Sequence, residues 1–295
     1  LIIEVRVNEY AMRDGNPNVP WTPAELGRDA RAIRDAGASV IHFHARGANG
    51  ESAHLPEEYA ACIREIRGQS DLIVHPTLGQ ITVGGQEERI RHIVELAKDP
   101  ALKPEIAAID TGSANIDIFD APSRTFKTTG KVYVNSHDTL MLFCRRFRDL
   151  GVRPVISAWN GPFLRSGGAL MAMGLISEPA YALLVHCEGG LLGGHPATND
   201  GLRSFLSHLP RDRRIEWTVC CKHGNLFPLT MQAIAEGGHV SIGIGDYDYP
   251  GDNHWNSGDH LLGGAGNDRL RGGQNDDYLD GGAGVDTAIF YGLRS

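Results

Sequence analysis

The sequence predicts a (β/α)8 barrel of the TIM type that lacks a normal eighth helix, followed by a short β-roll of nonapeptide repeats. Three observations support this fold class. Eight short apolar runs alternate with helical patterns over the first 250 residues, which is typical of a parallel barrel. No amphipathic helical pattern follows the eighth run, and a segment with a nine-residue repeat begins soon after it. We therefore expect a barrel domain over residues 1–250 and a repeat domain over residues 251–295.

The composition narrows the classes of function. The chain has 295 residues, with 28 Lys and Arg against 36 Asp and Glu, and a formal net charge of −8. An acidic chain without a basic run is a poor partner for nucleic acid or for anionic membranes. No apolar stretch approaches the roughly 20 residues that a membrane-spanning helix needs. The five cysteines are odd in number and lack zinc-ligand spacing, so we expect reduced core residues and a cytoplasmic protein.

The predicted strands are apolar runs that are typical of strands buried on both faces. They cover residues 1–7, 40–44, 71–75, 106–110, 155–159, 181–186, 215–220 and 239–244. A doubly wound parallel sheet is the alternative arrangement of such strands. No Gly-x-Gly-x-x-Gly turn follows any of these runs, so we favour the barrel.

The helices between the strands have recognisable start and stop signals. In the first helix Thr22 is the predicted N-cap, Pro23 is the first helical residue, Glu25 completes a capping box and Gly37 ends the helix. Similar helical patterns cover residues 56–67, 86–98 and 138–150, and residues 114–135 are predicted as an inserted hairpin or extended loop.

Polar side chains follow the predicted strands where a parallel barrel places its active site, at the carboxyl ends of the strands. These residues are Asn8, Glu9, His42, His44, His75, Thr77, Asp110, Ser113, Trp159, Asn160, His186, Glu188, Lys222, His223 and Asp246. Because all eight strands end in this way, packing alone does not explain the pattern. Among these residues we expect five to contact the substrate, namely Asn8, Glu9, His75, Asp110 and Asn160.

His42 and His44 form the clearest candidate metal site. Two residues apart on a strand, both imidazoles point to the same face and can bind one metal ion. Two imidazoles leave zinc short of ligands, so a carboxylate or a third histidine must complete the site. Hydrogen-bonded strand histidines are the alternative interpretation, but their position at a strand end favours the metal.

Glu9 is a candidate carboxylate near this pair. Val5, Val7 and Glu9 alternate along the first strand, so we expect the acid to end a row of inward-facing apolar residues. A solvated acid just past the strand is the alternative.

Several of these segments together resemble the β-keto acid cleavage enzymes, the family of the 3-keto-5-aminohexanoate cleavage enzyme. The resemblance extends over nearly all of residues 1–250. The matching segments are Val7-Asn8-Glu9, Pro20-Trp21-Thr22-Pro23-Ala24-Glu25, residues 36–46 (AGASVIHFHAR), Asp110-Thr111-Gly112-Ser113-Ala114-Asn115 and Gly237-Gly238-His239-Val240-Ser241-Ile242-Gly243.

The resemblance implies a zinc-dependent barrel that exchanges acyl groups between a β-keto acid and acetyl-CoA. The products are then acetoacetate and a new acyl-CoA. The resemblance also implies a cytosolic location, as in the barrel family. By position, His42 and His44 match the family's zinc-binding histidines, and Glu9 falls near its substrate-contacting Glu.

Three further positions acquire roles from the same resemblance. Thr77 falls where the family has a catalytic Ser, and Ser113 falls on a substrate-contacting Thr. Asp246 falls on an acid whose partner Arg helps to deprotonate the substrate. We expect Asp246, Thr77 and Ser113 to be the catalytic residues.

The last strand departs from the family motif at two positions. Ser241 stands where the family has that Arg, and Gly245 stands where it has the Glu that is its usual third zinc ligand. The third ligand is therefore open among Glu9, His75 and Asp246, and the family's activity is in question for this chain.

The remaining groups are consistent with carbon–carbon bond cleavage. A divalent zinc ion that chelates the keto and carboxylate oxygens stabilises the enolate formed when the bond breaks. Asp246 is suited to act as the general base. Lys222 either replaces the missing Arg or is a solvated loop lysine, and we favour the solvated lysine.

The last 45 residues have a composition of their own, with 11 glycines, seven Asp and a net charge of −4. Asp259, Asp268, Asp277 and Asp286 are nine residues apart, and leucines follow the first three in step. The segment resembles the calcium-binding RTX repeat, in which glycine turns direct carbonyls at the ion and the Asp supplies a charged oxygen. A flexible linker would not keep both residues in register, so we expect calcium at these four Asp.

Two functions remain open from the sequence. The first is a zinc-dependent acyltransferase of β-keto acids, with acetyl-CoA as second substrate. The second is a calcium-binding protein, secreted by a type I route that needs no N-terminal signal, in which the barrel is inactive. A barrel without its eighth helix leaves apolar surface uncovered, so we also expect a homo-oligomer or cover from the tail.

Overall fold

The computed structural model describes residues 1–78 and 85–247, together with four short segments, 260–262, 269–271, 278–280 and 287–289. The chain divides into two compact units. One contains Leu1–Met12 and Asn18–Tyr247, and the other contains Arg13–Pro17 and Asp248–Ser295.

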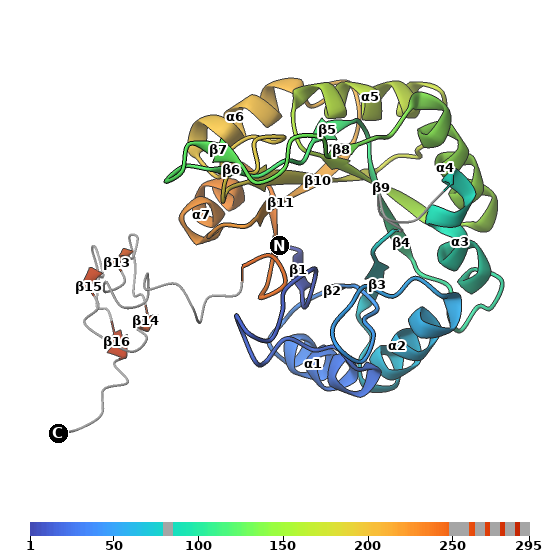
Figure 1. Cartoon of the computed structure of the whole chain (residues 1–295), viewed down its shortest axis with the longest axis horizontal. Helices are drawn as coiled ribbons and strands as arrows, with labels where there is room; N and C mark the ends of the chain where they lie inside the picture. Colours follow the sequence, from blue (N-terminus) through green and yellow to red (C-terminus); the bar gives the residue numbers. More distant parts are fainter. Residues whose placement is uncertain (79–84, 248–259, 263–268, 272–277, 281–286, 290–295) are drawn as a thin grey trace. The chain divides into compact units, whose positions relative to one another are not determined.

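The larger unit is a nearly closed parallel barrel, as the sequence predicted (Figure 1). Its eight strands are hydrogen-bonded in the order β3-β2-β1-β12-β11-β10-β9-β4. Their bounds are β1 Ile3–Arg6, β2 Val40–Phe43, β3 Ile73–Pro76, β4 Ile106–Asp110, β9 Arg153–Ala158, β10 Ala180–Cys187, β11 Ile215–Lys222 and β12 His239–Ile242. The first and last strands of the barrel pair directly, with Ile3 opposite Val240 and Val5 opposite Ile242.

Helices surround this sheet on its outer side (Figure 1). Those of the described residues are α1 Pro23–Asp35, α2 Pro56–Gln69, α3 Gln86–Leu96, α4 His137–Leu150, α5 Gly161–Ala172, α6 Asn199–His208 and α7 Phe227–Ala235. Thr22 and Glu25 form the predicted capping box at the start of α1. None of these helices is long and apolar enough to cross a membrane.

The predicted insertion consists of two small antiparallel pairs. Strand β5 (Ala114–Asn115) pairs with β8 (Val132–Tyr133), and β6 (Phe119–Asp120) pairs with β7 (Thr125–Phe126).

The eighth helix is absent from the described part of the barrel unit. Strand β12 is followed by a turn at residues 244–246, and no helix begins before Tyr247.

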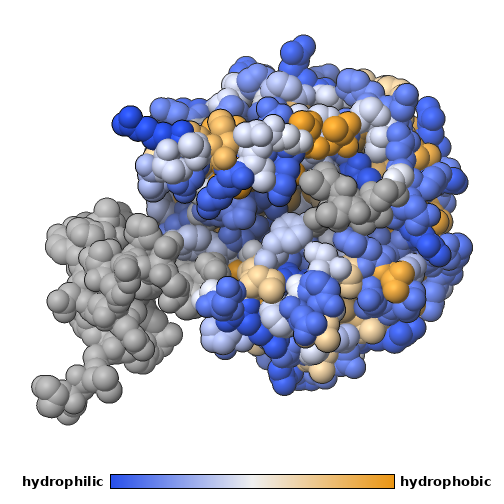
Figure 2. Space-filling view, in the orientation of Figure 1, coloured by the Kyte–Doolittle hydropathy of each residue, from blue (hydrophilic) through white to orange (hydrophobic). Residues whose placement is uncertain are grey.

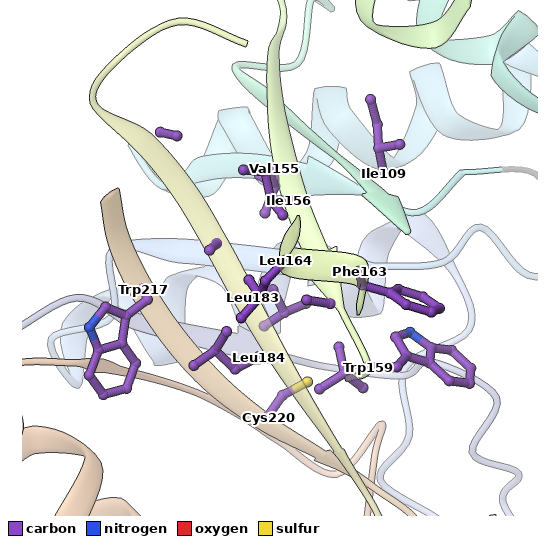
Figure 3. Packing of buried hydrophobic residues seen from close by; sticks show 14 of the residues in the cluster. Ile109, Val155, Ile156, Trp159, Phe163, Leu164, Leu183, Leu184, Trp217 and Cys220 are labelled. Carbon is purple, nitrogen blue, oxygen red and sulfur yellow. The ribbon is translucent and has the colours of Figure 1, made fainter. Parts of the chain in front are cut away.

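The apolar core lies between the sheet and the helices. Figure 3 shows Val155 and Leu183 of neighbouring strands among its residues, with Trp159 stacked beside Phe163 of α5. The five cysteines are free and buried, as predicted. The surface in view is mainly hydrophilic, with a few separate apolar areas (Figure 2).

Strand β1 corrects one prediction about side-chain direction. Val7 packs in a cluster with Leu26 and Ala30 of α1, so the apolar face of this strand points outward to the helices. The opposite face holds Glu4 and Arg6, both buried. The inside of the barrel is therefore charged at β1, because the strand needs its apolar side chains for the helix layer.

The second unit contains four short strands: β13 His260–Leu262, β14 Arg269–Arg271, β15 Tyr278–Asp280 and β16 Thr287–Ile289. Strand β13 pairs in parallel with β15, and β14 pairs with β16. Each pair joins repeats that are two apart in the chain, as in a β-roll whose successive strands alternate between two sheets. The four predicted calcium ligands, Asp259, Asp268, Asp277 and Asp286, lie outside the described residues.

Candidate active site

The candidate site is a buried cluster at the carboxyl ends of β1 and β2, with Glu9 at its centre. Glu9 Oε1 lies 2.8 Å from His42 Nε2, and Glu9 Oε2 lies 3.0 Å from His44 Nε2. All three side chains are almost fully buried. The structure therefore brings together the two predicted zinc histidines and one of the three candidates for the third ligand.

The loop after β1 holds Glu9 in place. Glu9 has a φ of +32°, a backbone conformation that non-glycine residues adopt at a cost of about 1–2 kcal/mol. Asn8 ties this loop to β2, because its amide donates to His44 O at 2.9 Å and its carbonyl accepts from His44 N at 2.9 Å. Arg46 donates to Glu9 O at 2.5 Å and to Ala11 O at 2.9 Å. These contacts maintain the conformation that turns the Glu9 carboxylate inward.

Two cations and a second carboxylate adjoin the cluster. Arg6 forms ion pairs with Glu9 and with Asp246, the latter at 2.5 Å from Nε to Oδ2. Lys222 Nζ lies 3.4 Å from Glu9 Oε2 and 3.9 Å from Asp246 Oδ1, and its side chain is 20% exposed. Lys222 thus faces the site, which corrects the prediction of a solvated loop lysine.

The electrostatics keep both histidines neutral. Burial lowers the pKa of His42 well below its ordinary value, and the charge of Arg6 lowers it further. Burial and the charge of Lys222 do the same to the pKa of His44. Neutral imidazoles are the form that binds metal, so neither must lose a proton first.

A divalent metal ion fits this cluster. One ligand atom from each of Glu9, His42 and His44 lies within 4.8 Å of the others. Two histidines and a glutamate are a known ligand set for catalytic zinc, in which a further coordination position stays open for water or substrate. The buried His42 Nδ1 and His44 Nε2 have no hydrogen-bond partner of good geometry among the described residues. Both the chemistry and the burial of these donors suit zinc.

A second group of potential ligands lies further inside the barrel. Glu4, His42 and His75 also offer ligand atoms within 4.8 Å of one another. Here, however, Glu4 Oε1 and His75 Nδ1 already pair at 2.6 Å. Burial alone would raise the pKa of Glu4, but His75 and Arg6 lower it to about 2. Glu4 and His75 therefore form a buried hydrogen-bonded pair next to His42, and the predicted site residue His75 belongs to this pair.

Tyr10 marks the more open side of the site. Its ring packs edge-on against His44 at a centroid distance of 5.0 Å, and the residue is 45% exposed.

Asp110 and Asn160, two predicted substrate contacts, are engaged within the protein. The Asp110 carboxylate accepts hydrogen bonds from Ser157 at 2.5 Å, Trp159 at 2.9 Å and Tyr133 at 3.0 Å. Asn160 caps α5 and donates to Gly193 O at 3.2 Å. Both side chains hold the strand ends in position.

Thr77 and Ser113, two predicted catalytic residues, make their hydrogen bonds away from the cluster. The Ser113 hydroxyl accepts from Asn135 N at 2.8 Å, and Ser113 is exposed. Thr77 follows β3, and its carbonyl oxygen accepts from His92 Nε2 at 2.7 Å. Among the described residues, neither hydroxyl forms a hydrogen bond with Asp246.

Arg6 and Arg46 are residues of the cluster to which the sequence analysis assigned no role of their own. The alternation of Glu4 and Arg6 with apolar Ile3, Val5 and Val7 was the available signal for Arg6. In a barrel strand buried on both faces, charged residues at alternate positions must face the interior and find partners there. The sequence contains no comparable signal for Arg46, because four of its hydrogen-bond partners are backbone carbonyls of loop residues.

Two known families match different parts of the chain. The beta-keto acid cleavage enzyme family matches residues 1–260. The RTX calcium-binding nonapeptide repeat matches residues 256–288 in four copies.

Individual relatives match most of the barrel. The 3-keto-5-aminohexanoate cleavage enzyme of Acetoanaerobium sticklandii is 29% identical over 238 residues, covering 80% of this chain and 79% of the relative. The 3-dehydrocarnitine:acetyl-CoA trimethylamine transferase of Rhizobium meliloti is 25% identical and covers 79% and 78%. The 3-oxoadipate:acetyl-CoA acetyltransferase of Cupriavidus necator is 24% identical and covers 78% and 74%.

Among solved structures, the apo structure of ObcA is similar, with a TM-score of 0.60 at 16% identity. The match covers 78% of this chain and 56% of that one, and it supports the barrel fold.

Proposed function

The chain belongs to the β-keto acid cleavage enzyme family, and we propose that its barrel exchanges acyl groups between a β-keto acid and acetyl-CoA with a zinc ion held by His42, His44 and Glu9. The observation that supports this proposal best is the Glu9 carboxylate between two neutral imidazoles, with Asp246 paired to the same arginine, Arg6. A barrel used only as a scaffold would have no need to bury so many charged groups at one end of its strands.

The proposed reaction is balanced without a further reactant. The β-keto acid R–CO–CH2–COO⁻ loses a proton from C2, and C2 then bonds to the acetyl carbonyl carbon while the CoA thiolate leaves. The thiolate adds to the R–CO carbon, and the bond between that carbon and C2 breaks. C2 takes the electron pair and regains the proton, which gives acetoacetate and R–CO–SCoA.

The residues of this chain divide the work as follows. Zinc, when bound, supplies the positive charge that stabilises the enolate oxygens of the substrate. Asp246 takes the C2 proton and returns it. It is the carboxylate adjoining the cluster that is not in the proposed ligand set, so it is free to act as the base. Lys222, which is partly exposed and close to both carboxylates, attracts the anionic substrates to the site.

The test is acyl exchange with ¹⁴C-acetyl-CoA on purified full-length protein with added zinc. The panel contains 3-keto-5-aminohexanoate, 3-dehydrocarnitine, 3-oxoadipate and the uncharged-tail analogue 3-oxohexanoate. We expect labelled acetoacetate from at least one of them. Asp246→Asn lowers kcat by about 100-fold or more, whereas Asp200→Asn, at an exposed position of α6, leaves it unchanged. Absence of labelled acetoacetate with every panel member refutes the proposal, and so does full activity of Asp246→Asn.

A second candidate function concerns the repeat unit. The family match over residues 256–288 and the pairing of repeats two apart support a calcium-binding β-roll. We infer that calcium orders this unit, and that the protein is either cytoplasmic or exported by a type I route. Immunodetection of the full chain in cells and in the growth medium distinguishes the two locations. Recovery in the medium alone favours export.

A further inference from the structure

Arg6 of strand β1 forms an ion pair with Asp246, which follows the last strand of the barrel. Arg6 lies on the interior face of β1 and is buried. Its guanidinium reaches across the β1–β12 boundary to Asp246, with 2.5 Å between Nε and Oδ2, and also contacts Glu9. One side chain therefore joins the proposed base to the proposed metal ligand.

Strand β12 has no such cation of its own. Ser241 pairs in register with Glu4 and is fully buried. Its hydroxyl has no hydrogen-bond partner among the described residues. A small side chain at this inward position leaves room inside the barrel for the long side chain of Arg6, two residues further along β1.

The glycine after β12 fits the same arrangement. A Cβ atom on Gly245 would lie 2.7 Å from Asn8 N, 2.8 Å from Glu9 N and 2.9 Å from Arg6 O. These neighbours are backbone atoms, so they cannot move aside cheaply. Residues 6–9 thus occupy the space that a side chain at position 245 would need, and they bring their own carboxylate and cation with them.

Lys222 is a weaker candidate for the same task. Its Nζ lies 3.9 Å from Asp246 Oδ1, beyond hydrogen-bond distance, and it is partly exposed. A planar guanidinium that is buried and fixed between two carboxylates orients them better than a flexible ammonium does.

We propose that Arg6 is the residue that positions the base Asp246, and that in this chain the base-positioning cation and the carboxylate of the metal site both come from the first strand of the barrel rather than the last. The inference rests on the proposed function. Arg6 fixes Asp246 through Oδ2, so Oδ1 is the oxygen that accepts the C2 proton. The guanidinium stays protonated throughout, and the proton moves only between C2 and Asp246.

The first test measures proton removal by itself. Wild type, Arg6→Ser, Arg6→Lys and the swap Arg6→Ser/Ser241→Arg, which has the wild-type composition, are compared at saturating zinc without acetyl-CoA. The readout is the incorporation of deuterium from D2O at C2 of the panel β-keto acid that wild type uses best. Arg91→Ser, an exposed change on α3, is the matched control.

We expect Arg6→Ser to lower the enzyme-dependent exchange rate by about 100-fold. Arg6→Lys should retain more activity than Arg6→Ser, and the swap should recover at least tenfold over Arg6→Ser because the cation returns from the neighbouring strand. Exchange by Arg6→Ser within threefold of wild type overturns the proposal, as does a folded, zinc-loaded swap no faster than Arg6→Ser. If Arg6→Ser yields no soluble protein, the exchange rate of the swap is compared with that of wild type. A swap that exchanges at less than about one hundredth of the wild-type rate then overturns the proposal.

The second test uses protein stripped of metal and needs no activity. Thermal unfolding is measured for Arg6→Gln, which removes the charge, for Asp246→Asn and for the double variant. Since the two side chains pair, the loss of Tm in the double variant should be smaller than the sum of the single losses by about 4 °C or more. Additive losses overturn the pairing. This cycle is informative even if wild type exchanges no acyl groups, a result that refutes the proposed function alone.

Discussion

Replacing Asn8 by alanine tests whether the loop after β1 builds the metal site. The Asn8 side chain is buried and makes three hydrogen bonds to main-chain atoms, with His44 O, His44 N and Pro20 O at 2.9, 2.9 and 3.0 Å. Asn8 is not one of the three proposed metal ligands. Its removal therefore perturbs the positions of Glu9 and His44 without removing a ligand.

These three hydrogen bonds determine the expected size of the effect. At about 1 kcal/mol each, their removal lowers the free energy of unfolding by about 3 kcal/mol. For a domain of this size, that is a fall in Tm of roughly 6–12 °C. Groups that orient metal ligands typically contribute 10–100-fold to metal affinity, so zinc should bind about 10–100-fold more weakly.

The assays are thermal unfolding of the metal-free protein and competition with a chromophoric zinc chelator. Asn199→Ala, at an exposed position at the start of α6, is the matched control and should change neither quantity. A Tm for Asn8→Ala within about 2 °C of wild type, together with unchanged zinc affinity, would refute the role given to this loop.

Three further predictions use other parts of the chain. Gly245→Ala should lower the free energy of unfolding in urea by about 1–3 kcal/mol, because the added Cβ meets backbone atoms. Gly68→Ala in helix α2, where nothing lies within 4 Å of the added Cβ, should be neutral or slightly stabilising. Equal effects of the two changes would contradict the steric argument. Burial lowers the pKa of His186 from 6.5 to about 4, so the unfolded state binds more protons in this window and stability falls as the pH drops from 6.5 to 4. His186→Gln should show a flatter stability curve there, and an unchanged curve would count against this explanation. Asp268→Ala/Asp277→Ala should lower the calcium bound by the full chain in equilibrium dialysis, and undiminished binding would place calcium elsewhere.

Local signals in the sequence were sufficient to predict the barrel. Each buried strand is an uninterrupted apolar run, and the capping box of Thr22 and Glu25 defines the start of α1. The direction of β1 was predicted incorrectly because a strand buried on both faces has no solvent side to orient the alternation. Only the presence of Val7 in the same hydrophobic cluster as Leu26 of α1 shows that the apolar side of β1 faces the helices.

The site was predictable in part. The spacing of His42 and His44 indicates a shared face, and the structure brings both to Glu9. The position of Arg6 beside Asp246 could not be predicted, since the two residues are joined only when the first and last strands of the barrel pair. The sequence of the last strand could therefore not indicate that a cation from the first strand pairs with Asp246.

The most direct test of the account is the zinc content of the purified full chain, measured by mass spectrometry after calcium has been removed with a calcium-selective chelator. We expect about one zinc per chain in wild type, and a loss of most of it in His42→Ala, His44→Ala and Glu9→Gln. His239→Ala, a change at the amino-terminal end of β12, where this histidine lies beside Glu216, should retain it. Zinc content that is equal in wild type and in all three cluster variants would contradict a zinc site at His42, His44 and Glu9.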